Sequence, residues 1–152
     1  MHPGQISRQN RLMTAVEVVL GSALERADVL SLYNSVGWTV YTGDPDRLMH
    51  ALAGSSTVVV ARENGRLLGI ARVISDGASI AYLQDVLVRP SAQRAGLGRL
   101  LVEAALSPYP DVRQKVLLTD DEPAQRAFYE SMGFAETRDF GDGTLRAFVR
   151  FA

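Results

Sequence analysis

The sequence contains no cysteine among its 152 residues. Without a thiol there can be no disulfide, no cysteine-ligated zinc and no cysteine nucleophile. Histidine is also scarce, since only His2 and His50 occur and neither lies beside an acidic cluster. No metal site is expected, because a zinc centre needs three or four converging side chains.

An excess of charge of one sign is also lacking. Sixteen Lys and Arg residues face 17 Asp and Glu residues, which leaves a net charge of −1. Such a chain has no bulk field to attract nucleic acid or an anionic membrane. No apolar run approaches the roughly 18 residues that a spanning helix needs, and the polar start, residues 1–11, has no apolar signal-peptide core. We therefore expect a cytoplasmic protein without nucleic-acid or membrane partners, in which any anion site is built locally.

Length and composition favour one folded unit. With 152 residues, of which 47% are hydrophobic, the chain can bury a substantial core. It shows no repeat, linker or low-complexity segment, so we predict a single domain over 1–152, with 1–12 as a flexible N-terminal extension.

The hydrophobic periodicity and the turn residues predict an α+β chain. Strands and helices alternate in the order β-αα-βββ-α-β-α-ββ. Strands are expected at 14–20, 56–62, 67–74, 79–88, 115–119, 134–137 and 145–151, and helices at 27–36, 45–54, 98–107 and about 122–133. The strand at 79–88, the helix after it and the strand at 115–119 form a β-α-β crossover, so these two strands should be parallel.

The most informative motif is Gln93-Arg94-Ala95-Gly96-Leu97-Gly98, between an apolar strand and a helical pattern. Glycines at a helix N-terminus let backbone N–H groups approach an anion, most often a phosphate. A Walker loop would need Lys followed by Ser or Thr, but Arg99-Leu100 follows here. A dinucleotide fingerprint would need a third glycine. A loop whose glycines only make a turn stays open on this pattern alone.

The motif resembles the Gln/Arg-x-x-Gly-x-Gly/Ala signature of the GNAT (Gcn5-related N-acetyltransferase) superfamily. Separately, residues 35–41 resemble the corresponding segment of its arylalkylamine acetyltransferase-like members. Two further blocks agree with the family, and the element order matches from about Thr14 onward. These blocks are Val86-Leu87-Val88-Arg89-Pro90 and Phe128-Tyr129-Glu130-Ser131-Met132-Gly133-Phe134.

The resemblance implies a GNAT fold and acetyl-CoA as co-substrate. The fold is a mixed, mostly antiparallel sheet of seven strands with about four helices, in which strands four and five are parallel and splayed. The backbone of Val86, Leu87 and Val88 would hold the pantetheine arm. The pyrophosphate would contact Gln93, Arg94, Ala95, Gly96, Leu97, Gly98 and Arg99. A solvated surface role for Arg94 and Arg99 is the alternative.

The resemblance also suggests the acid and the base. Tyr129 matches the family's tyrosine acid, and a packed core tyrosine is the alternative. The usual base position is Gln84, which cannot usefully accept a proton, so the base is Asp85 or water, and a structural hydrogen-bond role for Asp85 stays open. Asp85 faces away from Gln84 if the strand is regular, and a bulge would change this. The position seven residues before Tyr129, often Asn in relatives, is Glu122 here, which puts that cofactor contact in doubt.

The acceptor is expected between the first two helices and their connection. Tyr33, Trp38 and Tyr41 cluster there in the sequence and can cradle an apolar amine or its cation, although Trp38 can also be core. Tyr82 and Gln84 share a strand face that can line the site. Arg72 and Asp76 can contact a carboxylate or an amine, or form a surface pair.

Three functions follow from these residues. The first is N-acetylation of a primary amine of a small molecule by direct attack on acetyl-CoA in a ternary complex. The second is acetylation of a protein lysine or N-terminus, and the third is a non-catalytic acyl-CoA-binding module. Dimers are common in the family, so a homodimer is compatible with the resemblance, but no sequence feature shows one.

Overall fold

The computed structural model describes residues 14–152, so the predicted flexible extension at 1–12 lies outside the described residues. The chain divides into two compact units, one ending at Leu117 and one spanning Leu118–Ala152. Each is described by itself, and the single domain stays a prediction.

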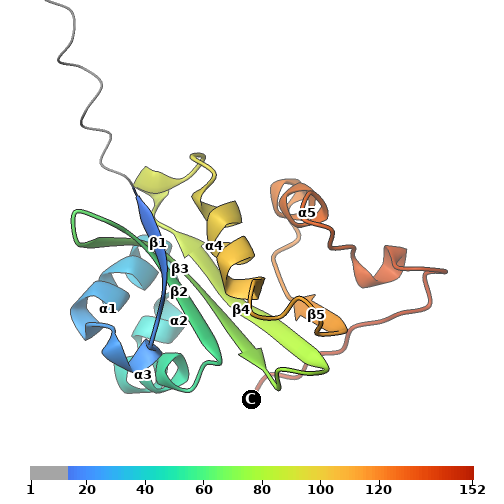
Figure 1. Cartoon of the computed structure of the whole chain (residues 1–152), viewed down its shortest axis with the longest axis horizontal. Helices are drawn as coiled ribbons and strands as arrows, with labels where there is room; N and C mark the ends of the chain where they lie inside the picture. Colours follow the sequence, from blue (N-terminus) through green and yellow to red (C-terminus); the bar gives the residue numbers. More distant parts are fainter. Residues whose placement is uncertain (1–13) are drawn as a thin grey trace, which may run out of the picture. The chain divides into compact units, whose positions relative to one another are not determined.

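The first unit is built on a five-stranded sheet in the order β1-β2-β3-β4-β5 (Figure 1). Neighbouring strands are antiparallel except β4 and β5, which are parallel as predicted. The β4–β5 ladder covers only Ile80–Leu83 of β4, so the second half of β4 has no β5 partner. The strands are β1 (Ala15–Val19), β2 (Thr57–Glu63), β3 (Arg66–Ser75), β4 (Ile80–Val88) and β5 (Gln114–Leu117).

Local sequence explains the hairpin between β2 and β3. Asn64 and Gly65 have φ of 52° and 77°, and a two-residue turn with two positive φ angles matches the twist of paired strands. The β-branched run Val58–Val60 that precedes it is fully buried. The turn and the burial together set the register of the central strands.

Helices cover both faces of this sheet (Figure 1). On one face, side chains of α1 and α3 pack with Val58, Ile70 and Leu87 in one buried cluster. On the other face lies α4, whose Leu101 meets the sheet at Gly69. The Asp44 carboxylate caps α3 by accepting from the Arg47 N–H at 3.1 Å, as its Asp-Pro start predicts. The helices of this unit are α1 (Arg26–Ser35), α2 (Thr39–Thr42), α3 (Pro45–Ala53) and α4 (Leu97–Leu106), with short 3-10 turns η1 (Gly21–Ala23) and η2 (Pro90–Ala92).

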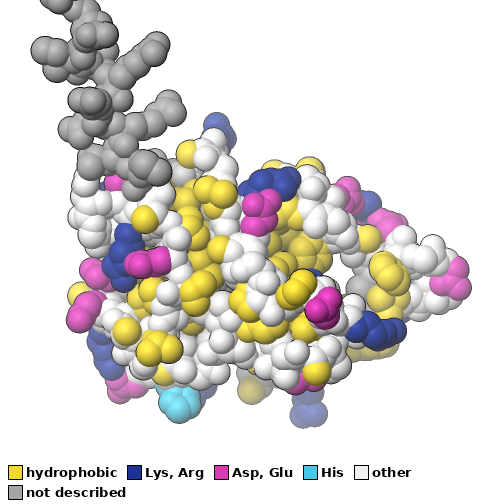
Figure 2. Space-filling model, viewed as in Figure 1, with side chains coloured by type: hydrophobic (Ala, Val, Ile, Leu, Met, Phe, Trp, Pro, Cys, Tyr) yellow, Lys and Arg dark blue, Asp and Glu magenta, His cyan; other side chains and the backbone are white. Residues whose placement is uncertain are grey.

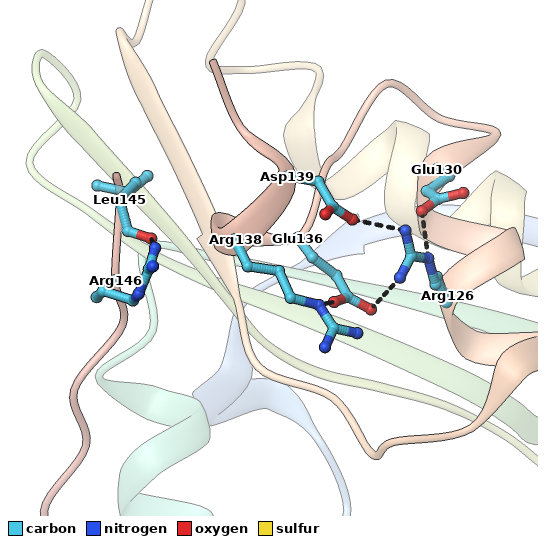
Figure 3. A network of polar contacts seen from close by, with 7 residues as sticks. All are labelled: Arg126, Glu130, Glu136, Arg138, Asp139, Leu145 and Arg146. Atoms are coloured by element: carbon cyan, nitrogen blue, oxygen red, sulfur yellow. Dashed lines mark hydrogen bonds and ion pairs between the residues drawn. The ribbon is translucent and has the colours of Figure 1, made fainter. Parts of the chain in front are cut away.

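The second unit holds α5 (Pro123–Glu130) and the 3-10 turn η3 (Thr137–Asp139). Figure 3 shows the guanidinium of Arg126 reaching three carboxylates. They belong to Glu130, Glu136 and Asp139, at 2.6, 3.2 and 2.6 Å. This fan of ion pairs joins α5 to the segment that follows it.

The prediction of seven strands is wrong for the described chain. Residues 134–137 and 145–151 form no strand, so the sheet over residues 14–152 has five. Residues 145–151 have the apolar side chains that suggested a strand, but Phe148 is 95% exposed and Phe151 is 83% exposed. A strand exists only where a neighbour pairs its backbone, and neither segment has such a neighbour.

Candidate functional site

The glycine loop, residues 93–98, connects β4 and η2 to α4. Two of its residues are left-handed, Arg94 at φ 68° and Gly96 at φ 78°. A Cβ added at Gly96 would meet nothing within 4 Å. Glycine is therefore favoured there by its backbone angle, and the space around it stays open to a ligand.

The loop ends in the first turn of α4, where the first helical bond runs from the Leu100 N–H to the Gly96 carbonyl at 3.2 Å. The amides of Leu97 and Gly98 precede this bond, in the turn where an α-helix has no carbonyl to pair them. With the positive end of the helix dipole they make a place suited to an anion.

Two side chains in and next to the glycine loop are engaged by their own neighbours. The Gln93 amide donates to the Val88 carbonyl at 3.0 Å, and Arg99 pairs with Glu103 at 3.2 Å. Arg94 and Ala95 are exposed. Figure 2 shows acidic and basic side chains interspersed on the face it displays, so a phosphate would be held by local backbone donors rather than by a broad basic patch.

Arg89 is a buried anchor for this loop. Its Nε donates to the Leu67 carbonyl at 2.7 Å, and one Nη donates to the Ser31 hydroxyl at 2.9 Å. It is only 6% exposed, and this burial lowers the pKa of the Arg89 guanidinium. No motif pointed to this role, although an arginine next to Pro90 at a strand end is a position where such an anchor is useful.

A β-bulge lies in the middle of β4. Arg72 pairs with Asp85 and Val73 with Leu83, so Gln84 is an extra residue with no partner on β3. A bulge re-aims side chains and breaks strict alternation. Gln84 and Asp85, which are adjacent in sequence, therefore both reach the hydroxyl of Tyr41. The side chain of Asp85 thus lies on the face covered by α1.

The Asp85 carboxylate is the centre of a buried polar network. It is 1% exposed and accepts three hydrogen bonds. Arg72 Nε donates to Oδ2 at 2.6 Å, Tyr33 donates to the same oxygen at 2.9 Å, and Tyr41 donates to Oδ1 at 3.1 Å. We call Tyr33, Tyr41, Arg72, Gln84 and Asp85 the Asp85 cluster.

Burial raises the pKa of both tyrosines of this cluster, but the two differ in exposure. Burial first, and then the charge of Asp85, raise the pKa of Tyr33 well above its ordinary value. The same two causes raise the pKa of Tyr41. Tyr33 is fully buried, whereas Tyr41 is half-buried. Only Tyr41 therefore has a hydroxyl that both bonds Asp85 and lies at the edge of the core.

The three aromatic residues predicted for the acceptor site do come together. Tyr33 lies 6.0 Å from Trp38 and 5.4 Å from Tyr41, and Trp38 stacks on Tyr41 at 5.8 Å between ring centroids. Trp38 and Tyr41 pack against the core cluster but stay partly exposed. The faces that Trp38 and Tyr41 turn toward each other are occupied by this stacking.

The remaining predicted residues lie apart from one another. Arg72 is 6% exposed and engaged by Asp85, while Asp76 closes an exposed turn by accepting from the Ser79 N–H at 2.8 Å. Tyr82 is half-buried on β4, and burial raises its pKa. Val86 is half-buried, and Leu87 and Val88 are buried.

Tyr129 belongs to the second unit, on α5. Its ring lies 5.0 Å from Phe128 and 5.9 Å from Phe134, in edge contacts. Burial raises its pKa. Glu122, at the N-cap of the same helix, makes no side-chain cap.

Two kinds of feature are absent from residues 14–152. No group of three His, Asp or Glu side chains is placed to hold a metal ion. Within the same residues, every helix is too short or too polar to cross a membrane.

Comparison with known proteins decides the family. The model of the acetyltransferase (GNAT) domain matches residues 29–151. The chain belongs to the GNAT acetyltransferase family. The solved structure of the GNAT protein SP0256 from Streptococcus pneumoniae TIGR4 has a TM-score of 0.80 at 28% identity, covering 92% of this chain and 98% of that one. Members of this family use acetyl-CoA as the acetyl donor.

Two curated plant relatives are also similar. Histone acetyltransferase TAP1 of Glycine max is 30% identical over 131 residues, which are 75% of this chain and 53% of the relative. Serotonin N-acetyltransferase 2, chloroplastic, of Oryza sativa subsp. japonica is 35% identical over 101 residues, which are 62% of this chain and 49% of the relative. The GNAT chain thus spans about half the length of these relatives.

Proposed function

We propose that this GNAT protein transfers an acetyl group from acetyl-CoA to a primary amine of a small molecule. The binding of acetyl-CoA in this proposal is supported by the glycine loop, in which the left-handed residues Arg94 and Gly96 lead into the N-terminus of α4. Its open backbone suits a pyrophosphate, and the family supplies the identity of the donor.

The proposed chemistry is direct attack in a ternary complex. The amine nitrogen bonds to the thioester carbonyl carbon, the carbon–sulfur bond breaks, and coenzyme A leaves as a thiolate. Backbone N–H groups of β4 would polarise the carbonyl, and the pantetheine arm would run along Val86–Val88. The chain has no cysteine to form an acyl-enzyme.

Two protons must move in this reaction. At pH 7 an alkyl amine with a pKa near 10.4 is almost wholly protonated, which costs about 4–5 kcal/mol unless the site removes the proton. Asp85 is 1% exposed and already accepts three hydrogen bonds, which favours water as the base. Tyr129, whose hydroxyl is protonated at neutral pH, would then protonate the leaving thiolate.

The aromatic residues Trp38 and Tyr41 favour a small acceptor with an apolar body. Similarity to a serotonin N-acetyltransferase points the same way. Similarity to a histone acetyltransferase favours a second candidate, acetylation of a protein lysine. The two differ in the size of the acceptor and can be separated directly.

A thiol-release assay with acetyl-CoA tests this proposal. The panel should contain serotonin, 2-phenylethylamine, an aminoglycoside and a lysine-bearing histone peptide. We expect turnover with the small arylalkylamines. Turnover with the peptide alone would assign the second function, and binding of acetyl-CoA without turnover of any amine would indicate a non-catalytic acyl-CoA-binding module.

A further inference from the structure

The direction of every hydrogen bond in the Asp85 cluster is set by its charges. As the ion-pair partner of Arg72, the Asp85 carboxylate only accepts. The Tyr41 hydroxyl must therefore donate its one proton to Asp85 Oδ1. With that proton used, the Tyr41 oxygen can only accept in its contact with Gln84, so the donor there is the Gln84 Nε2 group, at 3.1 Å.

This chain of bonds fixes the orientation of the Gln84 amide. Because Nε2 faces Tyr41, the carbonyl oxygen Oε1 faces away from it. Within residues 14–152 this oxygen has no hydrogen-bond partner, and it is not buried without one. Gln84 is half-buried and is the bulged residue of β4. The cluster thus holds one hydrogen-bond acceptor at its half-exposed end.

We propose that Gln84 Oε1 accepts a hydrogen bond from the reacting nitrogen of the acceptor amine, and that Tyr41, Asp85 and Arg72 are the positioning residues that aim it. This inference rests on the proposed function. It gives this position of β4 a binding role and not a general-base role, because a neutral amide accepts a hydrogen bond from the amine without taking its proton.

The same geometry defines the substrate class. Apart from the second N–H of the neutral Gln84 amide, the groups that the Asp85 cluster presents at its half-exposed end are the Tyr41 oxygen and Gln84 Oε1, and both are acceptors. The guanidinium of Arg72 is buried in its ion pair and does not serve a carboxylate. The site therefore favours primary amines that carry no carboxylate next to the nitrogen over α-amino acids.

A matched pair of variants tests the aiming role. Tyr41→Phe and Tyr109→Phe each remove one tyrosine hydroxyl that is hydrogen-bonded in the fold, but only Tyr41 is linked to Gln84. We expect Gln84→Met and Tyr41→Phe each to raise the KM for 2-phenylethylamine about tenfold, the loss of one hydrogen bond to a charged partner. The KM for acetyl-CoA should stay within about twofold. Tyr109→Phe should leave the amine KM within the same limit, because its hydroxyl is buried against Thr57 outside the Asp85 cluster.

The double variant tests the coupling. If Tyr41 acts through Gln84, Tyr41→Phe in a Gln84→Met background should raise the amine KM no further. Additive losses, or an unchanged amine KM in Gln84→Met, would overturn the inference. A wild-type protein that binds acetyl-CoA calorimetrically but turns over no amine would overturn the proposed function instead.

A matched pair of substrates tests the class. 2-Phenylethylamine and phenylalanine differ by one carboxylate. We expect kcat/KM for the amine to exceed that for the amino acid by at least about tenfold, because the carboxylate of phenylalanine would find no cationic partner in the site. Equal values would show that the acceptors at Tyr41 and Gln84 do not select the substrate.

Discussion

The glycine loop and the Asp85 cluster adjoin the same strand but are made of different parts. The loop follows β4 and offers backbone donors, with Gly96 in a left-handed conformation and α4 behind it. The cluster is centred on Asp85 of β4 and consists of side chains from α1, α2, β3 and β4 that hydrogen-bond one another. A ligand common to a whole family can be held by a local motif, whereas a selective site needs side chains from distant parts of the sequence.

The largest effect should come from breaking the cluster at its centre. Asp85→Ala strands the buried guanidinium of Arg72 and the hydroxyl of Tyr33, and should cost about 3–5 kcal/mol of unfolding free energy. Urea denaturation measures this cost. An Asp85→Leu/Arg72→Met double variant removes both charges and should recover much of it. A loss below about 1 kcal/mol in Asp85→Ala would show that the ion pair is not desolvated as described.

The proposed acid gives the next largest effect. Tyr129→Phe should lower kcat about a hundredfold, the usual contribution of a general acid, with little change in the KM for either substrate. Tyr109→Phe is the matched control, because its hydroxyl is buried against Thr57 within the first unit. If both variants keep wild-type kcat, Tyr129 is a packing residue between Phe128 and Phe134.

The glycine loop can be broken without touching the cluster. Gly96→Val and Gly65→Val force a branched side chain into nearly the same angle, φ 78° and 77°, and in both places the added Cβ meets nothing within 4 Å. Their stability losses should therefore be alike. Only Gly96→Val should weaken acetyl-CoA binding, by at least about tenfold in Kd. Equal Kd values in a calorimetric titration would remove the loop from the donor site.

The smallest expected effect is the pH dependence of stability that buried Tyr33 of the Asp85 cluster causes. Unfolded tyrosine ionises near pH 10, whereas native Tyr33 has a raised pKa and keeps its proton. Above pH 10 the unfolded state therefore binds fewer protons than the native state. The contribution of Tyr33 to the unfolding free energy is fully present below pH 10 and is lost as the pH rises. At pH 10.5 Tyr33 should account for about 0.8 kcal/mol of this fall. Urea denaturation of Tyr33→Phe at pH 8 and 10.5 should show a fall smaller by that amount, and an equal fall would contradict the burial of its hydroxyl.

Local signals made the loop and most elements predictable. Asn64-Gly65 and Asp44-Pro45 mark a turn and a helix start through their own backbone preferences. Residues 93–98 mark a strand-to-helix junction for the same reason. The parallel pairing of β4 and β5 followed from the crossover between them.

The parts that failed depend on distant partners. Residues 145–151 alternate as a strand does, yet a strand needs a neighbour, and Phe148 and Phe151 are exposed instead. Gln84 and Asp85 were expected on opposite faces of a regular strand, with a bulge left open. The bulge arises from the register between β3 and β4, and no residue type at position 84 announces it. Arg72 and Tyr33 could be named in the sequence, but not joined to Asp85.

Calorimetric titration of the wild-type protein with acetyl-CoA is the most direct test of the central claim, that the glycine loop holds the donor. We expect saturable binding of one acetyl-CoA per chain, with desulfo-coenzyme A competing because it keeps the pyrophosphate. No heat of binding at about 1 mM acetyl-CoA would contradict the claim. Such a result would mean a Kd above about 1 mM, which is a binding free energy weaker than about −4 kcal/mol.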